Sequence, residues 1–291
     1  SSLLQPLNPD IDQLASALQQ QSYSDFLQFH QQLLKQVHLE AFMLGNWRTS
    51  DAEQLTQSLK LWLTEQQQGE ALPRQRYNTQ DIGPVWVKVA VEHSDQALVI
   101  YLPSRQKRPV DMALFMLANH LLSPEYFHVL RTEQQLGYLV GTGYVPMNLL
   151  PGIAFYIQSP SASCADLYKA TLAFYKNFLS ELEELDDAEF VQMRQGLATQ
   201  IKERDSSLGA RAKRLWLAIG QGDHRFDLNE QIEVALEQLS LSDFIAFFYQ
   251  LLAPDYDAIF LATGDKPDHS HLTEQNPFNL LEKLPLLSEW L

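Results

Sequence analysis

Two strong hydrogen-bond donors and three glycines lie close together in the segment SPEYFHVLRTEQQLGYLVGTGY, which spans residues 123–144. Arg131 carries a guanidinium with several N–H donors, and Tyr138 carries a phenol with a single O–H donor. Fixed donors of this kind can bind a carbonyl oxygen and stabilise negative charge that develops on it. Each residue taken singly also has a structural explanation, Arg131 as a cation near a helix C-terminus and Tyr138 as an interfacial aromatic residue.

No complete metal-binding or nucleophile motif accompanies these donors. The sequence contains no zinc signature, no P-loop and no G-x-S-x-G elbow. The nearest approach to a zinc motif is HLTEQ at residues 271–275, where Gln275 stands in the place of the second histidine. The spacing of His120, Glu125 and His128 does not place all three on one helical face. We therefore predict that this chain holds no metal and no cofactor of its own.

A helix that precedes the donors and a strand that follows them must hold both side chains in place. Residues 109–122, rich in Met, Leu and Phe, predict one helix, and Ser123 and Pro124 suit the N-cap and first position of a second one. Gly137 is predicted to end this second helix, because glycine accepts a left-handed backbone. A strand is then predicted to start at Tyr138.

Two glycines in this strand predict a surface that another chain can approach. Gly141 and Gly143 are two residues apart, so they share one face of the strand. A face without side chains allows close approach of a second backbone. The segment GIAFYIQS at residues 152–159 predicts a further strand, because its apolar residues alternate.

The composition of the 291-residue chain excludes several functional classes. A net charge of −15 argues against nucleic-acid binding and against adhesion to acidic membranes, which both need basic surface. No apolar run approaches ~18 residues and the N-terminus shows no signal-peptide pattern, so no membrane span is expected. The single cysteine, Cys164, excludes an internal disulfide and a multi-cysteine metal site. We expect a soluble protein of the periplasm or the cytoplasm.

A repeated segment indicates two homologous domains. Residues 22–34 (SYSDFLQFHQQLL) and 240–252 (SLSDFIAFFYQLL) share eight of 13 residues at an offset of 218. Each copy leads into an apolar segment that ends at glycine and a polar residue, which predicts a helix followed by a strand in both. We therefore expect the C-terminal portion of a preceding domain plus a linker over residues 1–84, and a whole domain with a tail over residues 85–291. With a period of 218 residues, the domain of the first copy would begin before residue 1.

The other periodic segments predict an α+β fold. VWVKVAVE and ALVIYLP, joined by HSDQ, predict a hairpin over residues 85–103. Ser50 and Glu53 predict a capping box that opens a helix to about residue 67, and VHLEAFML predicts a strand at residues 37–44. Further helices are predicted at residues 10–20, 23–36, 163–184, 187–205 and 207–221, with Asp186 or Asp187 as the cap of the fourth. The absence of regular βαβ alternation favours a mostly antiparallel sheet packed against several helices.

The segment FHVLRTEQQLGYLVGTGY followed by GIAFYIQS resembles the C-terminal half of the pitrilysin/insulysin family, the insulinase-type or inverzincin zinc metallopeptidases. The specific part is the signature Arg131, Thr132, Gln135, Leu136, Gly137 and Tyr138. The resemblance extends back through MALFMLANHLLSPEYF and forward to HRFDLNEQI and the repeated helix. It covers most of residues 1–264 as a pattern.

The resemblance implies an activity that needs another part of the enzyme. In that family four homologous domains form two halves around a chamber that holds a peptide, and the first domain carries the zinc motif H-x-x-E-H. Zinc in the full-length enzyme activates water, while Arg131 and Tyr138 would hydrogen-bond the substrate backbone and stabilise the oxyanion. Phe127 would line a side-chain pocket, with Gly141 and Gly143 beside the substrate. The implied partners are a peptide substrate and the N-terminal zinc-bearing half.

Two other interpretations stay open beside this one. The chain could be a non-catalytic half that pairs with another chain, or an independent gene product that acts as a half-site partner. The intact pair of Arg131 and Tyr138 favours the enzyme, because a purely structural subunit has no need for aligned donors. Taken alone, the chain is expected to be inactive and to be able to self-associate through its exposed core.

Overall fold

A computed structural model describes residues 11–33, 35–64, 67–69, 73–203, 205–268, 271–275, 280 and 284–289. By their internal contacts the described residues divide into two units. Unit 1 comprises those within Ser1–Arg76, Arg204–Phe226 and Leu286–Leu291, and unit 2 comprises those within Tyr77–Glu203 and Asp227–Pro285. The domain boundary predicted at residue 84 stays a prediction. No described helix combines the length and the apolar character needed to span a bilayer.

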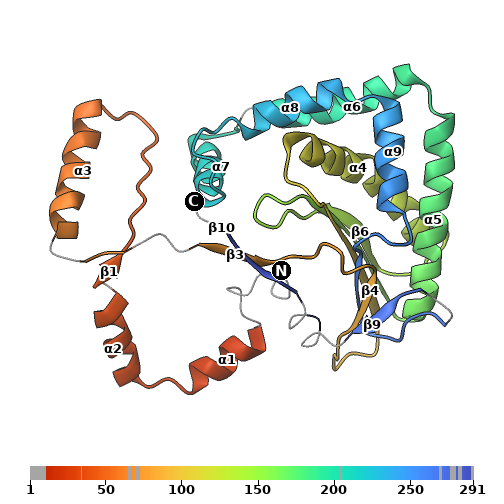
Figure 1. Cartoon of the computed structure of the whole chain (residues 1–291), viewed down its shortest axis with the longest axis horizontal. Coiled ribbons are helices and arrows are strands. Elements are labelled where there is room, and N and C mark those ends of the chain that lie inside the picture. The colour runs from red at the N-terminus through yellow and green to blue at the C-terminus, as the bar shows by residue number, and fades with distance from the viewer. Residues whose placement is uncertain are drawn as a thin grey trace. The chain divides into compact units, whose positions relative to one another are not determined.

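Unit 2 contains a six-stranded sheet among its described residues (Figure 1). Its strands are β4 (Val85–Lys88), β5 (Gln96–Pro103), β6 (Leu139–Tyr144), β7 (Gly152–Ser159), β8 (Ile259–Ala262) and β9 (Thr273–Gln275). Their spatial order is β6-β7-β5-β8-β4-β9. The pairs β6–β7, β5–β7 and β5–β8 are antiparallel, whereas β4 is parallel to β8 and to β9. The antiparallel-rich sheet confirms the predicted α+β class.

The hairpin predicted over residues 85–103 is wrong. Strand β8 lies between β4 and β5, so that Ile259 pairs with Val85 on one side and with Tyr101 on the other. Strand β4 is buried along most of its length, with Trp86 fully covered. A buried position in the sheet needs strands on both sides, and β8, which comes much later in the chain, provides one of them.

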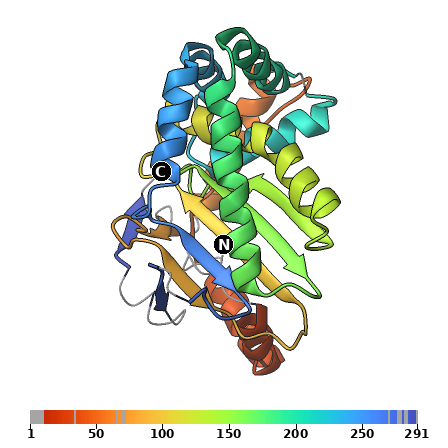
Figure 2. The same ribbon diagram turned by 90° about the vertical axis from the view of Figure 1, so that its right-hand side faces the viewer.

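In unit 2, helices gather over one face of this sheet, some packed on the strands and the others packed on those helices. They are α4 (Pro109–Phe127), the π-helix η1 (His128–Glu133), α5 (Cys164–Glu184), α6 (Asp187–Lys202), α8 (Leu228–Gln238) and α9 (Leu241–Leu251). Figure 2 shows α5, in green, crossing the sheet beside α9, in blue. Alternate residues of β7, namely Ile153, Phe155 and Ile157, share one core with these helices. The described helices and β7 agree closely with the predicted ones, and α8 was not predicted.

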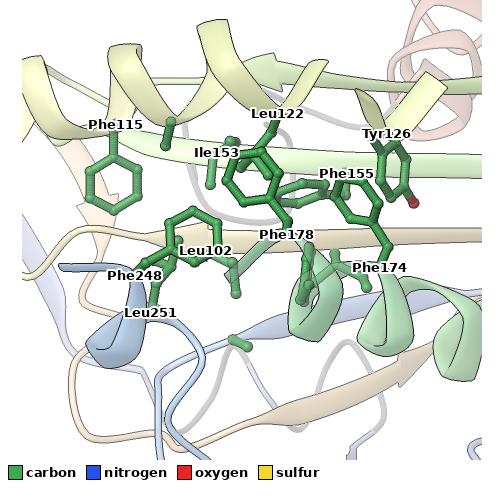
Figure 3. Packing of buried hydrophobic residues seen from close by; sticks show 14 of the residues in the cluster. Leu102, Phe115, Leu122, Tyr126, Ile153, Phe155, Phe174, Phe178, Phe248 and Leu251 are labelled. Atoms are coloured by element: carbon green, nitrogen blue, oxygen red, sulfur yellow. The ribbon is translucent and has the colours of Figure 1, made fainter. Parts of the chain in front are cut away.

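Tyr126 fixes the end of α4 on α5, directly before the segment that carries the donors. Its ring meets the rings of Phe155 and Phe174 edge-on, with centroids 5.3 and 5.2 Å away (Figure 3). Its buried hydroxyl lies 3.1 Å from the hydroxyl of Thr171, so the polar end is satisfied. Complete burial raises the pKa of Tyr126 well above its ordinary value.

The predicted helix start at Ser123 and Pro124 is wrong, because α4 continues through both residues to Phe127. Leu122, Tyr126 and Leu130 follow one another at four-residue intervals and are all fully buried. This packed stripe keeps the backbone helical although proline cannot donate an amide hydrogen to the preceding turn. Helix α4 then passes directly into η1.

Asp186 caps α6, as predicted for Asp186 or Asp187. Its carboxylate accepts the backbone N–H of Glu189 at 2.8 Å, and Glu189 accepts the N–H of Asp186 at 3.4 Å. This reciprocal pair satisfies two amide groups that the first turn of a helix otherwise leaves open. The cap therefore fixes where the chain turns from α5 into α6.

Replacing Asp186 with alanine is expected to lower the free energy of unfolding by about 1 kcal/mol, since the N-cap acceptor is lost. The neighbouring exposed Asp187 is the matched control, because it lies inside the first turn and accepts no capping bond. Asp187→Ala should cost less than half as much. Urea denaturation of both variants measures the difference, and equal losses would contradict the assignment of the cap to Asp186.

Unit 1 consists of short elements. These are α1 (Ile11–Gln19), α2 (Tyr23–Leu33), β1 (Gln36–Val37), α3 (Thr49–Thr64), β2 (Gln67–Gln68), β3 (Arg74–Tyr77), α7 (Leu208–Gly220) and β10 (Leu286–Glu289). Strand β1 pairs with β2 and β3 pairs with β10. The strand predicted at residues 37–44 is wrong beyond Val37, because only Gln36 and Val37 find a neighbouring strand. The capping box of Ser50 and Glu53 is also wrong, since α3 already begins at Thr49.

The repeated helices α2 and α9 share their local structure. Ser22 and Asp25 exchange capping bonds at the start of α2, and Ser240 and Asp243 exchange the same bonds at the start of α9. The serine hydrogen bonds lower the pKa of both aspartates. The packing differs, however, because Phe26 is 57% exposed and its counterpart Phe244 is fully buried.

Candidate functional site

A surface pocket of about 540 Å³ brings together most of the predicted site residues in unit 2. It is lined by Phe127, Arg131, Thr132, Gln135, Gly137, Tyr138, Pro160 and Ser161. The end of α4, η1, the loop after η1 and the residues that follow β7 supply these side chains. Three of the five predicted site residues, Phe127, Arg131 and Tyr138, thus line one pocket.

Arg131 is partly buried and aimed at this pocket from η1. Its Nη1 donates to the carbonyl oxygen of Gly137 at 2.7 Å, which ties the helix to the loop that follows it. A guanidinium carries five N–H donors, so the other N–H groups stay available for a ligand. Among the described residues, Arg131 forms no ion pair with a carboxylate. No carboxylate of the described residues therefore neutralises its positive charge.

Close packing requires a glycine at residue 137. The prediction that Gly137 ends the helix in a left-handed conformation is wrong. The residue with positive φ in this loop is Gln135, at 52°. A Cβ atom on Gly137 would lie 2.3 Å from the carbonyl oxygen of Gln158 on β7. The same carbonyl accepts the backbone N–H of Tyr138 at 3.1 Å. The absence of a side chain at residue 137 lets the loop lie directly on β7.

Tyr138 lies at the rim of the pocket and is 50% exposed. Its hydroxyl donates to Oδ2 of Asp95 at 2.8 Å. This hydrogen bond to a carboxylate raises the pKa of Tyr138 above its ordinary value. Asp95 belongs to the turn before β5, and no local sequence pattern marks it as a site residue. Within the sequence it reads only as a polar turn residue.

Phe127 supplies an apolar wall beside the two donors. The residue ends α4, directly after the buried Tyr126, and its own side chain is partly exposed. Because Tyr126 points into the core, its neighbour in the helix points away from it. An exposed aromatic ring beside fixed polar groups is typical of a site that binds a side chain next to a backbone contact.

Gly141 and Gly143 lie on β6 and do not line the pocket. Gly141 pairs with Tyr156 of β7, and a Cβ atom at Gly141 would lie 2.5 Å from the Tyr156 hydroxyl. The predicted bare surface is therefore wrong at Gly141, because an aromatic ring covers it. At Gly143 the nearest atom to an added Cβ is 3.6 Å away, in Val145. A substrate contact at either glycine stays a prediction.

The described residues contain no group of three or more His, Cys, Asp or Glu side chains that could hold a metal ion. His128 and Glu133 of η1 lie 3.2 Å apart and form an exposed pair. Both belong to the single helical turn beside the pocket. Chemically, the pocket offers hydrogen-bond donors and an aromatic ring, which suit the backbone and a side chain of a peptide.

The chain is similar to known peptidases over most of its length. Residues 117–216 match the family model described as "PQQ synthase PqqF-like, C-terminal lobe domain 4". Protease 3 of Salmonella typhi is 26% identical over 261 residues, which cover 86% of this chain and 27% of that protein. The insulin-degrading enzyme of Bos taurus is 28% identical over 252 residues, covering 84% of this chain and 24% of that protein. The chain thus spans about a quarter of the length of these relatives.

The fold is shared with solved structures of the same kind. The crystal structure of pitrilysin superposes with a TM-score of 0.82 at 23% identity, covering 97% of this chain and 31% of that one. A "peptidase M16 inactive domain" from Pseudomonas fluorescens superposes with a TM-score of 0.54 at 16% identity, covering 88% of this chain and 60% of that one. At these identities the superpositions show that the fold is shared.

Proposed function

Since this chain belongs to the insulinase-type (pitrilysin/insulysin) peptidase family and corresponds to its C-terminal region, we propose that it supplies the peptide-binding side of a zinc endopeptidase. The observation that carries the proposal is the pocket in which Phe127, Arg131 and Tyr138 meet. The zinc-bearing side would lie on an N-terminal half, and we call the combination of both halves the assembled enzyme.

The proposed chemistry divides between the two halves. Zinc supplies the activation of water in such peptidases. Arg131 donates N–H groups to the carbonyl oxygen of the scissile amide, where negative charge develops as water attacks. Tyr138 forms a second backbone contact beside it, and Phe127 packs against a neighbouring side chain of the peptide. These roles need no metal ligand from this chain.

One observation favours a second candidate function, a non-catalytic half that binds peptides. The hydroxyl proton of Tyr138 points at Asp95 and so is not free for an oxyanion in the structure. A half that only binds peptides needs a contact at Tyr138 but no donor there. Kinetics in the assembled enzyme separates the two functions, because loss of binding changes KM and loss of charge stabilisation changes kcat.

Replacing Tyr138 with phenylalanine in the assembled enzyme is expected to lower kcat/KM about tenfold, the value of one hydrogen bond of ~1.4 kcal/mol. Phenylalanine keeps the ring and its packing, so the melting temperature should stay within error. Tyr249→Phe is the matched control, because Tyr249 is 53% exposed and does not line the pocket. Steady-state kinetics on a quenched fluorescent peptide gives the result, and an unchanged kcat/KM would contradict the proposed contact.

The isolated chain is expected to hydrolyse no peptide, with or without added zinc, because the site it carries holds only binding groups. The measurement is product formation from a peptide mixture incubated with the pure chain and Zn²⁺, compared with the same sample in a chelator. Zinc-dependent hydrolysis by the pure chain would contradict the proposal that this chain binds the peptide while the N-terminal half activates water.

A further inference from the structure

We propose that Asp95 is a positioning residue that holds the phenol of Tyr138 at the rim of the pocket and engages its only proton. The inference rests on the proposed function, because the position of Tyr138 affects catalysis only if Tyr138 meets the peptide. It adds to that function a residue that lines no part of the pocket and comes from a different segment of the chain.

The contact between the two side chains joins distant parts of the sequence. Tyr138 donates to Asp95 Oδ2 at 2.8 Å across a separation of 43 residues. The phenol is half exposed and lies at the end of a loop, so packing alone leaves its ring free to choose among rotamers. A hydrogen bond to a fixed carboxylate selects one of these positions.

Asp95 is itself held in place. Its side chain is only 13% exposed. Its backbone N–H donates to Nδ1 of His93 at 3.0 Å, and Nε2 of Gln158 lies 3.4 Å from the same carboxylate oxygen that Tyr138 contacts. Gln158 also provides the carbonyl that receives the N–H of Tyr138. Gln158 of β7 therefore holds both the loop and the carboxylate, and the carboxylate in turn holds the phenol.

The direction of the hydrogen bond follows from the chemistry of the two groups. An ionised carboxylate can only accept, and a phenol has a single proton to donate. While Tyr138 donates to Asp95, it offers the pocket only the lone pairs of its oxygen, which suit a peptide N–H. Arg131 retains free N–H donors for the carbonyl. Donation from Tyr138 to an oxyanion then requires the bond to Asp95 to open.

The chain offers a matched pair for comparison in Tyr249 and Glu183. Tyr249 of α9 is 53% exposed, and its hydroxyl donates to the carboxylate of Glu183 at the end of α5. The hydrogen bond raises the pKa of Tyr249 in the same way as Asp95 raises the pKa of Tyr138. Neither Tyr249 nor Glu183 lines the pocket. The pair therefore has the same tyrosine–carboxylate hydrogen bond but is not expected to affect catalysis.

The first test follows the phenols directly in the chain as it stands. Tyrosine labelled with ¹³C at Cζ is titrated by NMR, and Tyr138→Phe and Tyr249→Phe assign the two signals. Asp95→Asn, which keeps the shape and removes the charge, should lower the pKa of Tyr138 and leave that of Tyr249 unchanged. Glu183→Gln should do the reverse. The unaffected tyrosine also verifies that each variant is folded.

The second test is a double-mutant cycle on kcat/KM in the assembled enzyme. Asp95→Asn should lower kcat/KM about tenfold when Tyr138 is present, and less than about twofold in the Tyr138→Phe background. Such non-additivity is expected of a residue that acts through Tyr138. Glu183→Gln should leave kcat/KM unchanged in both backgrounds.

Three results would overturn the inference, and they are distinguishable. If Asp95→Asn leaves the pKa of Tyr138 unchanged, the contact does not hold the phenol. If Asp95→Asn lowers kcat/KM equally with Tyr138 present and with Tyr138→Phe, Asp95 does not act through Tyr138. If Tyr138→Phe itself leaves kcat/KM unchanged while the NMR shift is present, the proposed contact of Tyr138 with the peptide fails, and the role of Asp95 in catalysis fails with it.

Discussion

Replacing Arg131 with alanine is expected to lower kcat/KM of the assembled enzyme by about 100- to 1,000-fold, the cost of removing one fixed donor to an oxyanion. Arg131 has the largest expected effect because it brings a full positive charge that no carboxylate of the described chain neutralises. The contact to the Gly137 carbonyl is also lost, but a single hydrogen bond to a partly exposed loop is worth only about 1 kcal/mol. The assembled enzyme should therefore stay folded and retain the zinc proposed for its N-terminal half.

Two further variants sharpen the test at Arg131. Arg131→Lys keeps a positive charge but lacks the planar fork of a guanidinium, so most of the loss should persist. Arg211→Ala removes an exposed arginine of α7, which lies outside the pocket, and should leave kcat/KM within about twofold. Zinc content and thermal melting are measured on all three. Equal losses for Arg131→Ala and Arg211→Ala would show a general charge effect and contradict the assigned role.

Replacing Gly137 with alanine is expected to lower the free energy of unfolding by about 1–3 kcal/mol, the usual cost of forcing an atom into filled space. The added Cβ would lie 2.3 Å from the Gln158 carbonyl oxygen, which is backbone and belongs to a paired strand. Either the loop or β7 must shift, and the loop carries Tyr138 with it. Activity should therefore fall more than the loss of stability alone explains.

Gly143 provides the matched control for this substitution. It lies on the adjoining strand, and an added Cβ would meet its nearest atom at an ordinary distance of 3.6 Å. Gly143→Ala should change the free energy of unfolding by less than about 0.5 kcal/mol. Chemical denaturation of both variants gives the comparison. A Gly137→Ala variant as stable as Gly143→Ala would contradict the packing argument.

Local sequence patterns predicted most helices but not the pairing of the strands. Residues 163–184 were predicted as a helix and form α5 at Cys164–Glu184, because capping and apolar periodicity act within a few residues. The neighbour of β4 is β8, which lies far along the chain, and no local pattern specifies such a partner. The helix start predicted at Pro124 is wrong for the same reason. The buried side chains at four-residue intervals through Tyr126 keep α4 helical across the proline.

The two copies of the repeat also show that local sequence does not determine burial. Helices α2 and α9 have similar sequences and the same Ser–Asp cap. Phe26 and Phe244 nevertheless differ in burial, because neighbours from the rest of the fold cover only Phe244. Sequence therefore predicts the cap and the helix of each copy, while burial depends on what packs against it.

The candidate site was predicted in part. The signature brought Phe127, Arg131 and Tyr138 together through its resemblance to a family, and the structure places all three around one pocket. Asp95 could not be found this way, because its contact with Tyr138 forms only when the turn before β5 meets the loop after η1. Gly137 was identified correctly as special but for the wrong physical reason.

The most direct test of the central claim is the position of a bound peptide. A crystal structure of the assembled enzyme with an uncleaved peptide measures the distance from the Arg131 guanidinium to the nearest backbone carbonyl oxygen. The proposed function predicts a distance below about 3.2 Å, with a peptide side chain against Phe127. A well-ordered peptide beside the zinc that leaves Arg131 and Tyr138 without any contact would contradict it.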